Sequence, residues 1–448
     1  MRDRDVIDLL VIGGGMAGCS AAAYAASHGA SVALVEKAAS VGGSAQYAGF
    51  IWTTPTAEAM AEVNPEADPA LTQVLVDGYE RALAWVRSLD IAVGDPVAVL
   101  RYGRGCHVDL PGLLEQCKKI VEMTPGCQVI TNATVESLLT NSGTVAGAVV
   151  SDQEGTRHEI RARFVLLATG GFSANEALRA TYLHPQAASM TLRSHPLNVG
   201  DGLRLGQEVG AAMAGLGAGF YGHLIPSNIE YRDPYEFALK TTYHSEHGTL
   251  VNVDGQRFCD ETIGDHLNAN ATLEQPEARA LLIYDQQARD QWELTSYVEG
   301  IAPVDKFELA LRSGGRCAVA QDLEEFAYLP PEWGYPGEAV MNTIATMNDA
   351  IFMSGPIPAR SLDSRPLDHP PYYCIEVIPA VTFTYPGLAV DPQARVLDAG
   401  AHVIPGLLAA GADAGGVFAN AYAGGLCLAL TYGLQAANTA LSAIGGSR

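Results

Sequence analysis

The sequence predicts an α/β protein whose βαβ domain is assembled from both ends of the chain, with an α+β domain inserted between them. A short apolar run, a glycine-rich turn and a helix of small residues open the chain and are typical of a βαβ unit. Strand patterns return after Pro370 and lead into a second glycine-rich turn and a last helix. Residues 215–345 contain scattered aromatic residues and prolines, and strand and helix patterns alternate there less clearly than in the rest of the chain. We therefore expect a first domain formed by 1–214 and 346–448, and an inserted substrate or cap domain at 215–345.

The individual elements follow from the spacing of the apolar residues. Residues 7–12 are expected as a strand that ends at Gly13, residues 16–27 as a helix, and residues 31–36 as the second strand. Further helices are expected at 72–89 and 110–123, and further strands at 128–131, 135–139, 145–151 and 164–168. A glycine-rich turn at 411–416 precedes a final helix that begins near Leu426.

The composition argues against several classes of partner. The 448 residues include 27 basic and 50 acidic side chains, a formal net charge of −23, which disfavours nucleic acid or an anionic membrane surface as the main partner. No apolar run approaches the length of a membrane span, and no signal-peptide h-region precedes the first strand. The eight cysteines form no CxxC pair, so no metal or iron–sulfur site is expected. We expect a cytoplasmic protein with no integral membrane segment.

The glycine turn after the first strand predicts a dinucleotide site. Gly13–Gly18 fits G-x-G-x-x-G between a strand and a helix: Gly13 allows the tight turn, Gly15 lets the backbone reach a pyrophosphate, and Gly18 allows close helix packing. The helix N-terminus offers free N–H groups and a positive dipole end to the phosphates. Glu36 ends the second strand, where an acid binds ribose hydroxyls. The other predicted contacts within the turn are Met16 and Ala17.

The spacing of this motif leaves FAD and NAD as alternatives, and the segments around it favour FAD. A second glycine-containing loop follows Glu36, as in flavoproteins that place such a loop beside the phosphates and ribityl chain. The strand at 164–168 also ends in a glycine turn. The cofactor contacts predicted from these two segments are Lys37, Gly42, Gly43, Ser44 and Ala45, and Ala168, Thr169 and Gly170.

Several longer runs resemble the FAD-dependent fumarate reductase and 3-ketosteroid dehydrogenase superfamily over nearly the whole chain. They are residues 42–52, 200–204, 257–261, 406–416 and 422–426. The resemblance implies that Asp413 binds the ribityl chain and that the backbone from Gly425 to Leu428 meets the pyrimidine end of the flavin. A helix N-terminus at that position stabilises negative charge on reduced flavin. The resemblance adds four more cofactor positions, Gly49, Val135, Asp201 and Gly411.

Three departures from the fumarate reductase pattern disfavour reduction of a C4-dicarboxylate. Tyr422 stands where those enzymes have an arginine before their L-G-G run. Glu261 is followed by residues 262–266 without the arginine that they carry there. Residues 382–387, Thr-Phe-Thr-Tyr-Pro-Gly, replace an H-H-T-M-G-G stretch and contain no histidine. The chain is more similar to the 3-ketosteroid Δ1-dehydrogenase-like branch, which desaturates cyclic ketones.

The ketosteroid branch implies a donor pair for a ketone oxygen. Carried over, the pair is the Tyr422 hydroxyl and the backbone N–H of Leu426. Removing a proton next to a carbonyl places negative charge on its oxygen, and preorganised donors stabilise that charge. The alternative for Tyr422 is a packed aromatic side chain with no catalytic role.

The general base is less defined. The matching family position is Asp265, give or take one residue, so Asp265 or His266 is the expected base. The alternative is a helix N-terminal acid beside a surface histidine. Tyr243, His244 and His247 are further candidates, on a segment expected as a strand over the flavin. Tyr102 is a further candidate, whose hydroxyl group would play a supporting role.

The resulting hypothesis is FAD-dependent α,β-desaturation of a cyclic ketone, either a 3-ketosteroid or a smaller cyclohexanone such as an oxocyclohexanecarboxylate. A base removes the α-proton and the β-hydrogen leaves as hydride to flavin N5. The electrons then pass to oxygen, a quinone or a carrier protein. No histidine stands in residues 43–52, so FAD is expected to bind non-covalently. The alternatives are an enone or fumarate-type reductase, and a non-catalytic FAD-binding subunit.

Overall fold

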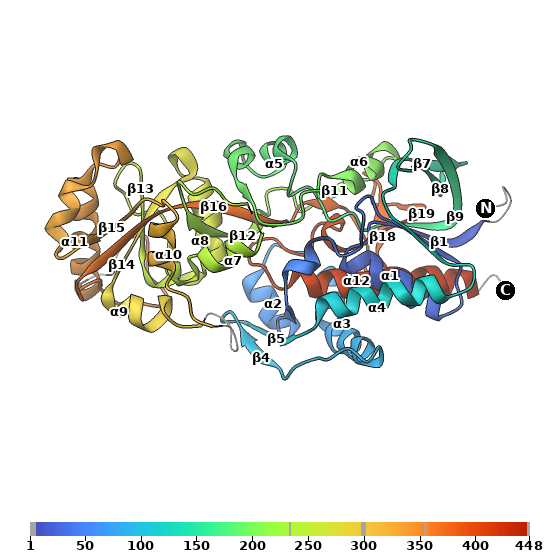
Figure 1. The fold of residues 1–448 in the computed structure, drawn as a ribbon, viewed down its shortest axis with the longest axis horizontal. Helices are drawn as coiled ribbons and strands as arrows, with labels where there is room; N and C mark the ends of the chain where they lie inside the picture. The colour runs from blue at the N-terminus through green and yellow to red at the C-terminus, as the bar shows by residue number, and fades with distance from the viewer. Residues whose placement is uncertain (1–5, 233, 297–301, 354, 356, 446–448) are drawn as a thin grey trace. The chain divides into compact units, whose positions relative to one another are not determined.

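The computed structural model describes residues 6–232, 234–296, 302–353, 355 and 357–445 (Figure 1). The chain forms two compact units. Unit 1 consists of Met1–Leu178, Ser194–Gly219 and Phe383–Arg448, and unit 2 of Arg179–Arg193 and Phe220–Thr382. The chain first leaves unit 1 within helix α5 (Glu176–Tyr182).

The main sheet of unit 1 is parallel at its centre. Strand β1 pairs in parallel with β2 and β9, β2 with β6, and β9 with β19, while β18 runs antiparallel to β19. The antiparallel pair β7–β8 extends the sheet from β9. Because a parallel sheet is covered on both faces, its central strands are mostly apolar, and every residue of β1, Asp8 included, is buried. The strands are β1 (Ile7–Ile12), β2 (Val32–Val35), β6 (Gln128–Ile130), β7 (Thr134–Asn141), β8 (Thr144–Ser151), β9 (Arg157–Leu167), β18 (Arg395–Leu397) and β19 (Val403–Ala409).

Helix α1 packs between α4 and α12 in unit 1. Its Ala-rich sequence lets α12 approach closely, since a Cβ on Gly433 of α12 would lie 2.5 Å from the carbonyl oxygen of Ala17. The segment returning from unit 2 thus completes the packing of the N-terminal βαβ unit. The helices of unit 1 are α1 (Met16–Ser27), α2 (Ala57–Val63), α3 (Pro69–Ser88), α4 (Leu110–Met123), α6 (Asp201–Glu208) and α12 (Gly425–Gly445).

Two small antiparallel sheets of unit 1 were not expected from the sequence. One consists of β3 (Phe50–Thr53), β4 (Val97–Val99) and β5 (Gly103–His107). The other pairs β11 (Met213–Ala214) with β17 (Gly387–Leu388). The three-stranded sheet is built around Trp52, whose side chain fills the space that a Cβ on Gly103 or Gly105 would occupy.

Unit 2 is an α+β body around a mixed sheet. The long strand β16 pairs with β10, β12, β14 and β15, and β14 pairs with β13. Side chains on β14 alternate between two apolar clusters, with Leu282 and Tyr284 in one and Leu281 and Ile283 in the other. The strands are β10 (Thr191–Leu192), β12 (Phe220–Pro226), β13 (Thr249–Asn252), β14 (Ala280–Asp285), β15 (Cys317–Ala320) and β16 (Tyr372–Thr384). The helices are α7 (Pro234–Lys240), α8 (Asp265–Leu273), α9 (Gln286–Ala288), α10 (Lys306–Arg312) and α11 (Gly337–Met353).

The predicted fold class, a Rossmann-type α/β domain with an inserted α+β domain, is confirmed. Of the expected insertion, 215–345, residues 220–345 fall in unit 2 and residues 215–219 in unit 1, while unit 2 also takes in 179–193 and continues to Thr382. The reason is β16: it forms the centre of the unit 2 sheet, and β10 pairs with it. Within the described ranges, no helix combines the length and the apolar run that a membrane span needs.

Candidate functional site

The glycine turn after β1 leaves an open cradle at the N-terminus of α1. Gly13 has φ +105°, and a Cβ there would lie 2.2 Å from the carbonyl oxygen of Ala168. A Cβ on Gly18 would lie 1.8 Å from the carbonyl oxygen of Gly13. These two positions therefore require glycine. Around Gly15 an added Cβ would meet nothing within 4 Å, so space is open where the first N–H groups of α1 point.

Glu36 joins the two glycine loops. One carboxylate oxygen accepts the N–H of Gly14 at 2.6 Å and the other accepts the N–H of Ala38 at 2.7 Å. Both of these bonds go to backbone, and a carboxylate can accept further bonds. A ribose hydroxyl therefore still has an acceptor on this side chain.

The second glycine loop lies against the first. The N–H of Gly42 donates to the carbonyl oxygen of Gly14 at 2.8 Å, and a Cβ on Gly43 would lie 3.3 Å from Cα of Gly15. Ser44 Oγ accepts the N–H of His195 at 3.0 Å, and the adjacent Ala45 is buried. The two loops that the sequence assigns to one cofactor are thus brought together.

Asp413 joins three segments of unit 1. Its buried carboxylate accepts the N–H of Thr169 at 2.5 Å, the Thr169 hydroxyl at 3.1 Å and the N–H of Gly171 at 3.1 Å. Thr169 Oγ1 also accepts the N–H of Gly202 at the start of α6, at 2.8 Å. Burial raises the pKa of Asp413, although these hydrogen bonds oppose the rise. Asp413 therefore holds the end of β9 against the turn that precedes α12.

The other predicted cofactor positions have identifiable contacts. Lys37 and Asp201 form an ion pair of 2.5 Å. The carbonyl oxygen of Val135 accepts from Arg204 at 3.3 Å. Two glycines also have packing roles: a Cβ on Gly49 would lie 3.3 Å from His107, and one on Gly411 would lie 3.3 Å from Cβ of Ala17. Ala168 and Gly170 form the turn at the end of β9, beside Gly13.

Tyr422 lies at the N-terminus of α12. Its ring packs in an aromatic cluster with Trp52 and Phe418, at centroid distances of 5.6 Å and 5.8 Å. The Tyr102 hydroxyl donates to the Tyr422 carbonyl oxygen at 2.8 Å. A Cβ on Gly425 would lie 2.9 Å from the Tyr422 hydroxyl oxygen, so that hydroxyl lies over the first turn of α12. The N–H of Leu426 belongs to the same turn, whose first N–H groups have no intrahelical partner.

The residues of unit 1 fit FAD. A Cβ added to Gly15 would meet no atom within 4 Å, so the space beside the N-terminus of α1 is open, where a pyrophosphate binds in Rossmann-type domains. The hydroxyls of Thr53 and Thr384 are buried without a hydrogen-bond partner among the described residues. Thr384 Oγ1 is next to Gly171, because a Cβ added to that glycine would lie 3.1 Å from the hydroxyl oxygen. Buried polar atoms are nearly always bonded, so these hydroxyls indicate a ligand with polar groups.

The family models agree with this geometry. The model of the FAD binding domain family matches residues 96–427, which is most of the chain. The chain belongs to the FAD binding domain family. A second model, described as FAD dependent oxidoreductase, matches residues 8–173. The predicted cofactor is thereby confirmed as FAD, and the protein is an FAD-dependent oxidoreductase.

Relatives of this FAD-binding chain lie in the predicted superfamily. A fumarate reductase (cytochrome) of Shewanella frigidimarina is 28% identical over 469 residues, covering 98% of this chain and 77% of the relative. The 3-ketosteroid Δ1-dehydrogenase of Sterolibacterium denitrificans superposes with a TM-score of 0.74 at 20% identity, covering 98% of this chain and 100% of that chain. The 3-ketosteroid Δ4-(5α)-dehydrogenase of Rhodococcus jostii RHA1 gives 0.74 at 22% identity, covering 98% of each. The superfamily is confirmed, and its ketosteroid branch stays a proposal.

Unit 2 of this flavoprotein contains a buried chain of polar side chains. Asp265 at the start of α8 hydrogen-bonds Nδ1 of His223, and His223 Nε2 lies 2.8 Å from the Tyr221 hydroxyl. Asp265 and His223 are 2% and 1% exposed, and Tyr221 is half-buried. His266, the other predicted base, is 1% exposed, with Nδ1 3.9 Å from Asp265. The expected surface histidine is therefore a core residue.

The protonation states in this chain follow from burial and charge. Burial, opposed by the attraction of Asp265, lowers the pKa of His223 to about 4. Burial alone would raise the pKa of Asp265, but the interactions with His223 and His266 hold it below its usual range. Near neutral pH the carboxylate is ionised and the imidazole neutral. His223 Nδ1–H then donates to Asp265, and Nε2 accepts the Tyr221 O–H.

Arg193 supplies the positive charge of this cluster. It donates to the Tyr243 hydroxyl at 3.1 Å and to Thr382 Oγ1 at 3.5 Å. Burial would lower the pKa of Arg193, but attraction to Tyr243, Tyr221 and Asp265 raises it overall. The structure thus brings together two predicted residues, Asp265 and Tyr243, with three that sequence reasoning missed: Tyr221, His223 and Arg193. Tyr221 and His223 stand two apart on β12 and so share a face, which is the pattern that could have revealed them.

The segment Tyr243–His247 was expected as a strand and forms a 3₁₀ helix instead. Its histidines have separate environments. His247 stacks on Trp292 at 3.8 Å and contacts Asp363 at 3.1 Å. His244 is 2% exposed, and neither ring nitrogen has a hydrogen-bond partner among the described residues. Burial, with Lys306, His247 and Arg289 nearby, holds its pKa well below the usual range.

His244→Phe should make folding less sensitive to acid. Below about pH 6.5 the unfolded chain protonates this histidine, whereas the folded chain keeps it neutral, so wild-type stability falls with pH. The edge-on ring contact with Tyr284 at 4.6 Å is one that Phe retains. We expect the variant to lose less Tm than wild type between pH 8 and about pH 5. Thermal unfolding at both pH values checks this, with exposed His402→Phe as control; equal losses in wild type and His244→Phe would contradict it.

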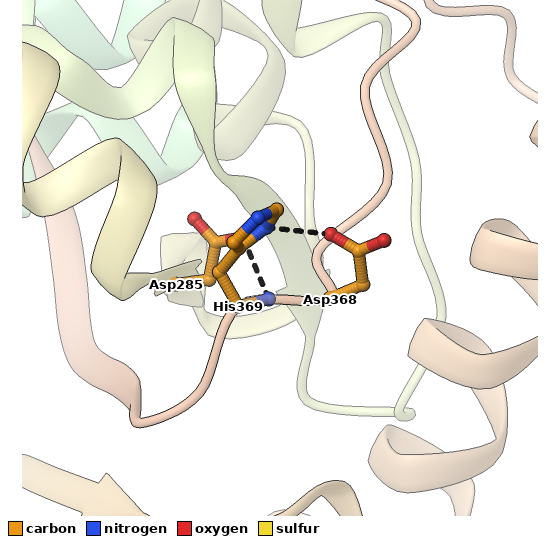
Figure 2. Close-up of side chains that lie close together, drawn as sticks. All are labelled: Asp285, Asp368 and His369. Atoms are coloured by element: carbon orange, nitrogen blue, oxygen red, sulfur yellow. Dashed lines mark hydrogen bonds and ion pairs between the residues drawn. The ribbon is translucent and has the colours of Figure 1, made fainter.

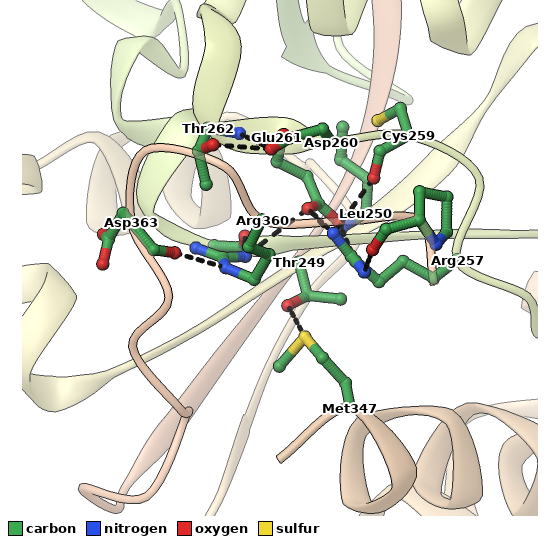
Figure 3. A network of polar contacts seen from close by, with 12 residues as sticks. Thr249, Leu250, Arg257, Cys259, Asp260, Glu261, Thr262, Met347, Arg360 and Asp363 are labelled. Carbon is green, nitrogen blue, oxygen red and sulfur yellow. Dashed lines mark hydrogen bonds and ion pairs between the residues drawn. The ribbon is translucent and has the colours of Figure 1, made fainter. Parts of the chain in front are cut away.

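The run Arg257–Glu261 holds the loop before α8 (Figure 3). Glu261 is fully buried and accepts from the N–H of Leu250 at 3.0 Å, from Arg257 at 2.6 Å and from Arg360 at 3.4 Å. A buried carboxylate needs such partners, because leaving it uncompensated is strongly destabilising. This network supports the chain segment that carries Asp265.

A second group of close polar side chains has a structural explanation. Asp285, Asp368 and His369 approach one another closely (Figure 2). Asp285 caps α9 by accepting the N–H of Ala288 at 2.9 Å, and it also accepts from Arg365 at 3.2 Å and from the N–H of His369 at 3.3 Å. These contacts account for the burial of Asp285 without a ligand.

Proposed function

We propose that the protein is an FAD-dependent oxidoreductase acting on a CH–CH group, and that it desaturates a cyclic ketone between the α and β carbons. The substrate is a 3-ketosteroid or a smaller cyclohexanone, for example an oxocyclohexanecarboxylate. The observation that carries this proposal is the position of Tyr422. Its hydroxyl lies over the N-terminal turn of α12, to which the N–H of Leu426 belongs, so two donors lie at one helix end.

These donors suit the charge that desaturation creates. Loss of the α-proton turns the ketone oxygen toward an enolate, which hydrogen bonds and the positive end of a helix stabilise. The aromatic cluster limits the ring positions of Tyr422, and the hydrogen bond from Tyr102 holds its backbone. Bound FAD supplies the acceptor for the β-hydrogen, which leaves as hydride. The chain's own task is to hold the ketone and move the α-proton.

A second candidate is the reverse reaction, reduction of an enone or of a fumarate-type acid. The fumarate reductase relative favours it. Tyr422 would stabilise the same charge in either direction, because the reaction is microscopically reversible. Two sequence features argue against a dicarboxylate substrate: Tyr422 stands where fumarate reductases have an arginine, and residues 382–387 contain no histidine. A candidate of another class is a non-catalytic FAD-binding subunit.

Anaerobic mixing with cyclic ketones tests the proposal. The purified yellow protein is mixed with a 3-ketosteroid, cyclohexanone and 4-oxocyclohexanecarboxylate, and absorbance of the oxidised flavin is followed. We expect bleaching by at least one ketone and none by cyclohexanecarboxylate, which lacks the carbonyl group. Reoxidation of dithionite-reduced protein by cyclohexenone or fumarate, with no bleaching by any ketone, would instead establish a reductase. Inertness in both assays would favour the non-catalytic subunit.

The remaining parts of the proposal concern the cofactor and the acceptor. FAD is proposed to dissociate, since residues 43–52 offer no histidine for a covalent link. The electrons are proposed to leave for oxygen, a quinone or a carrier protein. Acid precipitation should release the FAD into the supernatant.

A further inference from the structure

We propose that His195 of unit 1 binds the pyrophosphate of FAD through its Nε2–H group, and that protonation of the imidazole tightens the binding of the cofactor. His195 is not among the cofactor contacts that the sequence predicts. Retention of FAD by unit 1 does not depend on which reaction the protein catalyses, so this role goes beyond the proposed function.

The segment that carries His195 lies against the second glycine loop, and both belong to unit 1. The N–H of His195 donates to Ser44 Oγ at 3.0 Å, and Nδ2 of Asn198 donates to the same oxygen at 2.9 Å. Asp201, at the start of α6, forms an ion pair of 2.5 Å with Lys37. These three contacts hold the segment beside the loop along its length.

The Ser44 hydroxyl shows on which side of the segment a ligand would lie. A hydroxyl has two acceptor sites and one donor, and here His195 and Asn198 use both acceptor sites. The O–H bond of Ser44 is therefore directed away from these two residues. Ser44 follows Gly43, on which a Cβ would lie 3.3 Å from Cα of Gly15, and the space at Gly15 is open. The His195 segment is thus next to the place where a pyrophosphate binds in Rossmann-type domains.

The imidazole of His195 has one tautomer set by the backbone. Its Nδ1 accepts the N–H of Leu197 at 3.3 Å, so the neutral ring carries its proton on Nε2. Within the described ranges no acceptor pairs with Nε2, and the side chain is half-buried. A half-buried N–H donor on a ring held by its own backbone is suited to bind an anion.

The charges around His195 determine when the ring is protonated. Burial lowers its pKa, attraction to Glu36 opposes that change, and repulsion from Lys37 adds to it. Glu36 follows β2 and hydrogen-bonds both glycine loops, whereas Lys37 is paired with Asp201. Without FAD the ring is therefore neutral near pH 7. A bound pyrophosphate brings negative charge, which favours the protonated ring and raises the pKa of His195.

The sign of the pH dependence follows from this rise. A group whose pKa is higher in the complex takes up a proton when FAD binds, so FAD binds more tightly as the pH falls. The gain is complete below the pKa of His195 in the free protein and disappears above its pKa in the complex. A rise of about one pH unit corresponds to a tenfold change in Kd.

The Kd for FAD at two pH values tests the proposal. Diluted holoprotein is passed through an ultrafilter, and the fluorescence of FAD in the filtrate gives the Kd. For wild type we expect a Kd about tenfold lower at about pH 5.5 than at about pH 8. His195→Gln keeps an N–H donor but cannot be protonated, so its Kd should be the same at both pH values. The control is His402→Gln, at an exposed position of unit 1, which should behave as wild type.

Proton uptake gives a measurement that a purely structural role would not change. Calorimetric titration of apoprotein with FAD near pH 6, in buffers of different ionisation enthalpy, counts the protons bound. Wild type should take up a fraction of a proton, and His195→Gln should take up none; His195→Asn replaces it if the glutamine variant does not fold. Absence of uptake by wild type overturns the proposal. So does equal uptake, or an equal change of Kd with pH, in wild type and the variant.

Discussion

Tyr422→Phe should slow reduction of the bound flavin by a cyclic ketone by about 10²-fold or more. The substitution removes one hydroxyl from the N-terminal turn of α12 and leaves the ring in its cluster with Trp52 and Phe418. Charge on the ketone oxygen then has the Leu426 N–H and the helix dipole as its remaining stabilisers. Anaerobic stopped-flow absorbance measures the rate directly.

The matched control is Tyr432→Phe on the same helix. Its hydroxyl donates to the carbonyl oxygen of Leu71 at 2.9 Å and lies two turns further along α12. Loss of that buried hydrogen bond should cost about 1 kcal/mol of stability and leave the reduction rate unchanged. A Tyr422→Phe protein that reduces its flavin at the wild-type rate would remove this hydroxyl from the mechanism.

Gly15→Asp should yield a folded protein that holds no FAD. Gly15 has φ −81° and ψ −166°, a conformation open to any residue, and a Cβ there meets nothing within 4 Å. The apoprotein therefore tolerates the side chain. A carboxylate in the cradle would oppose a pyrophosphate with like charge, and we expect affinity for FAD to fall by about 10²-fold or more. Flavin absorbance per chain measures the loss of FAD, and thermal unfolding of the apoprotein shows whether the variant still folds.

Substitutions at two other glycines serve as controls. Gly445→Asp also enters open space, at the far end of α12, and should keep a full complement of FAD. Gly18→Ala should impair folding itself, because its Cβ would lie 1.8 Å from the carbonyl oxygen of Gly13. If Gly15→Asp retained wild-type FAD content, the pyrophosphate would have to bind elsewhere.

The local elements of unit 1 could be predicted because their patterns are local. The apolar run of β1, the turn at Gly13 and the small-residue helix α1 all lie within the first 27 residues and can be recognised from neighbouring residues alone. The predicted bounds of β1 and α1 agree with the structure. Helix α4 also has its predicted bounds, Leu110–Met123. Strand β9 was expected from residue 164 but begins at Arg157. Its first half, which pairs with β8, has three exposed residues followed by alternating buried and exposed ones, so it lacks the apolar run of a buried strand.

The buried chain of polar side chains in unit 2 could be predicted only in part. Asp265 was recognised as an acid at a helix start, but its partner His223 stands 42 residues earlier on a different element. No periodicity joins a strand to a helix across that separation, and the role of a carboxylate depends on what it contacts. The limits of unit 2 were missed for the same reason, because β16 joins its sheet through long-range pairing.

The construction of unit 1 from three chain segments has a consequence during synthesis. Strands β1 and β2 are made early. Strand β19, which pairs with β9, and helix α12, which packs on α1, are made only after unit 2. Unit 2 lies wholly between residues 179 and 382 and is complete before those segments have been made. The face of α1 that packs on α12 therefore stays uncovered until residues 425–445 have been made. Until then it is apolar surface in an unfinished domain, which is a surface prone to aggregation.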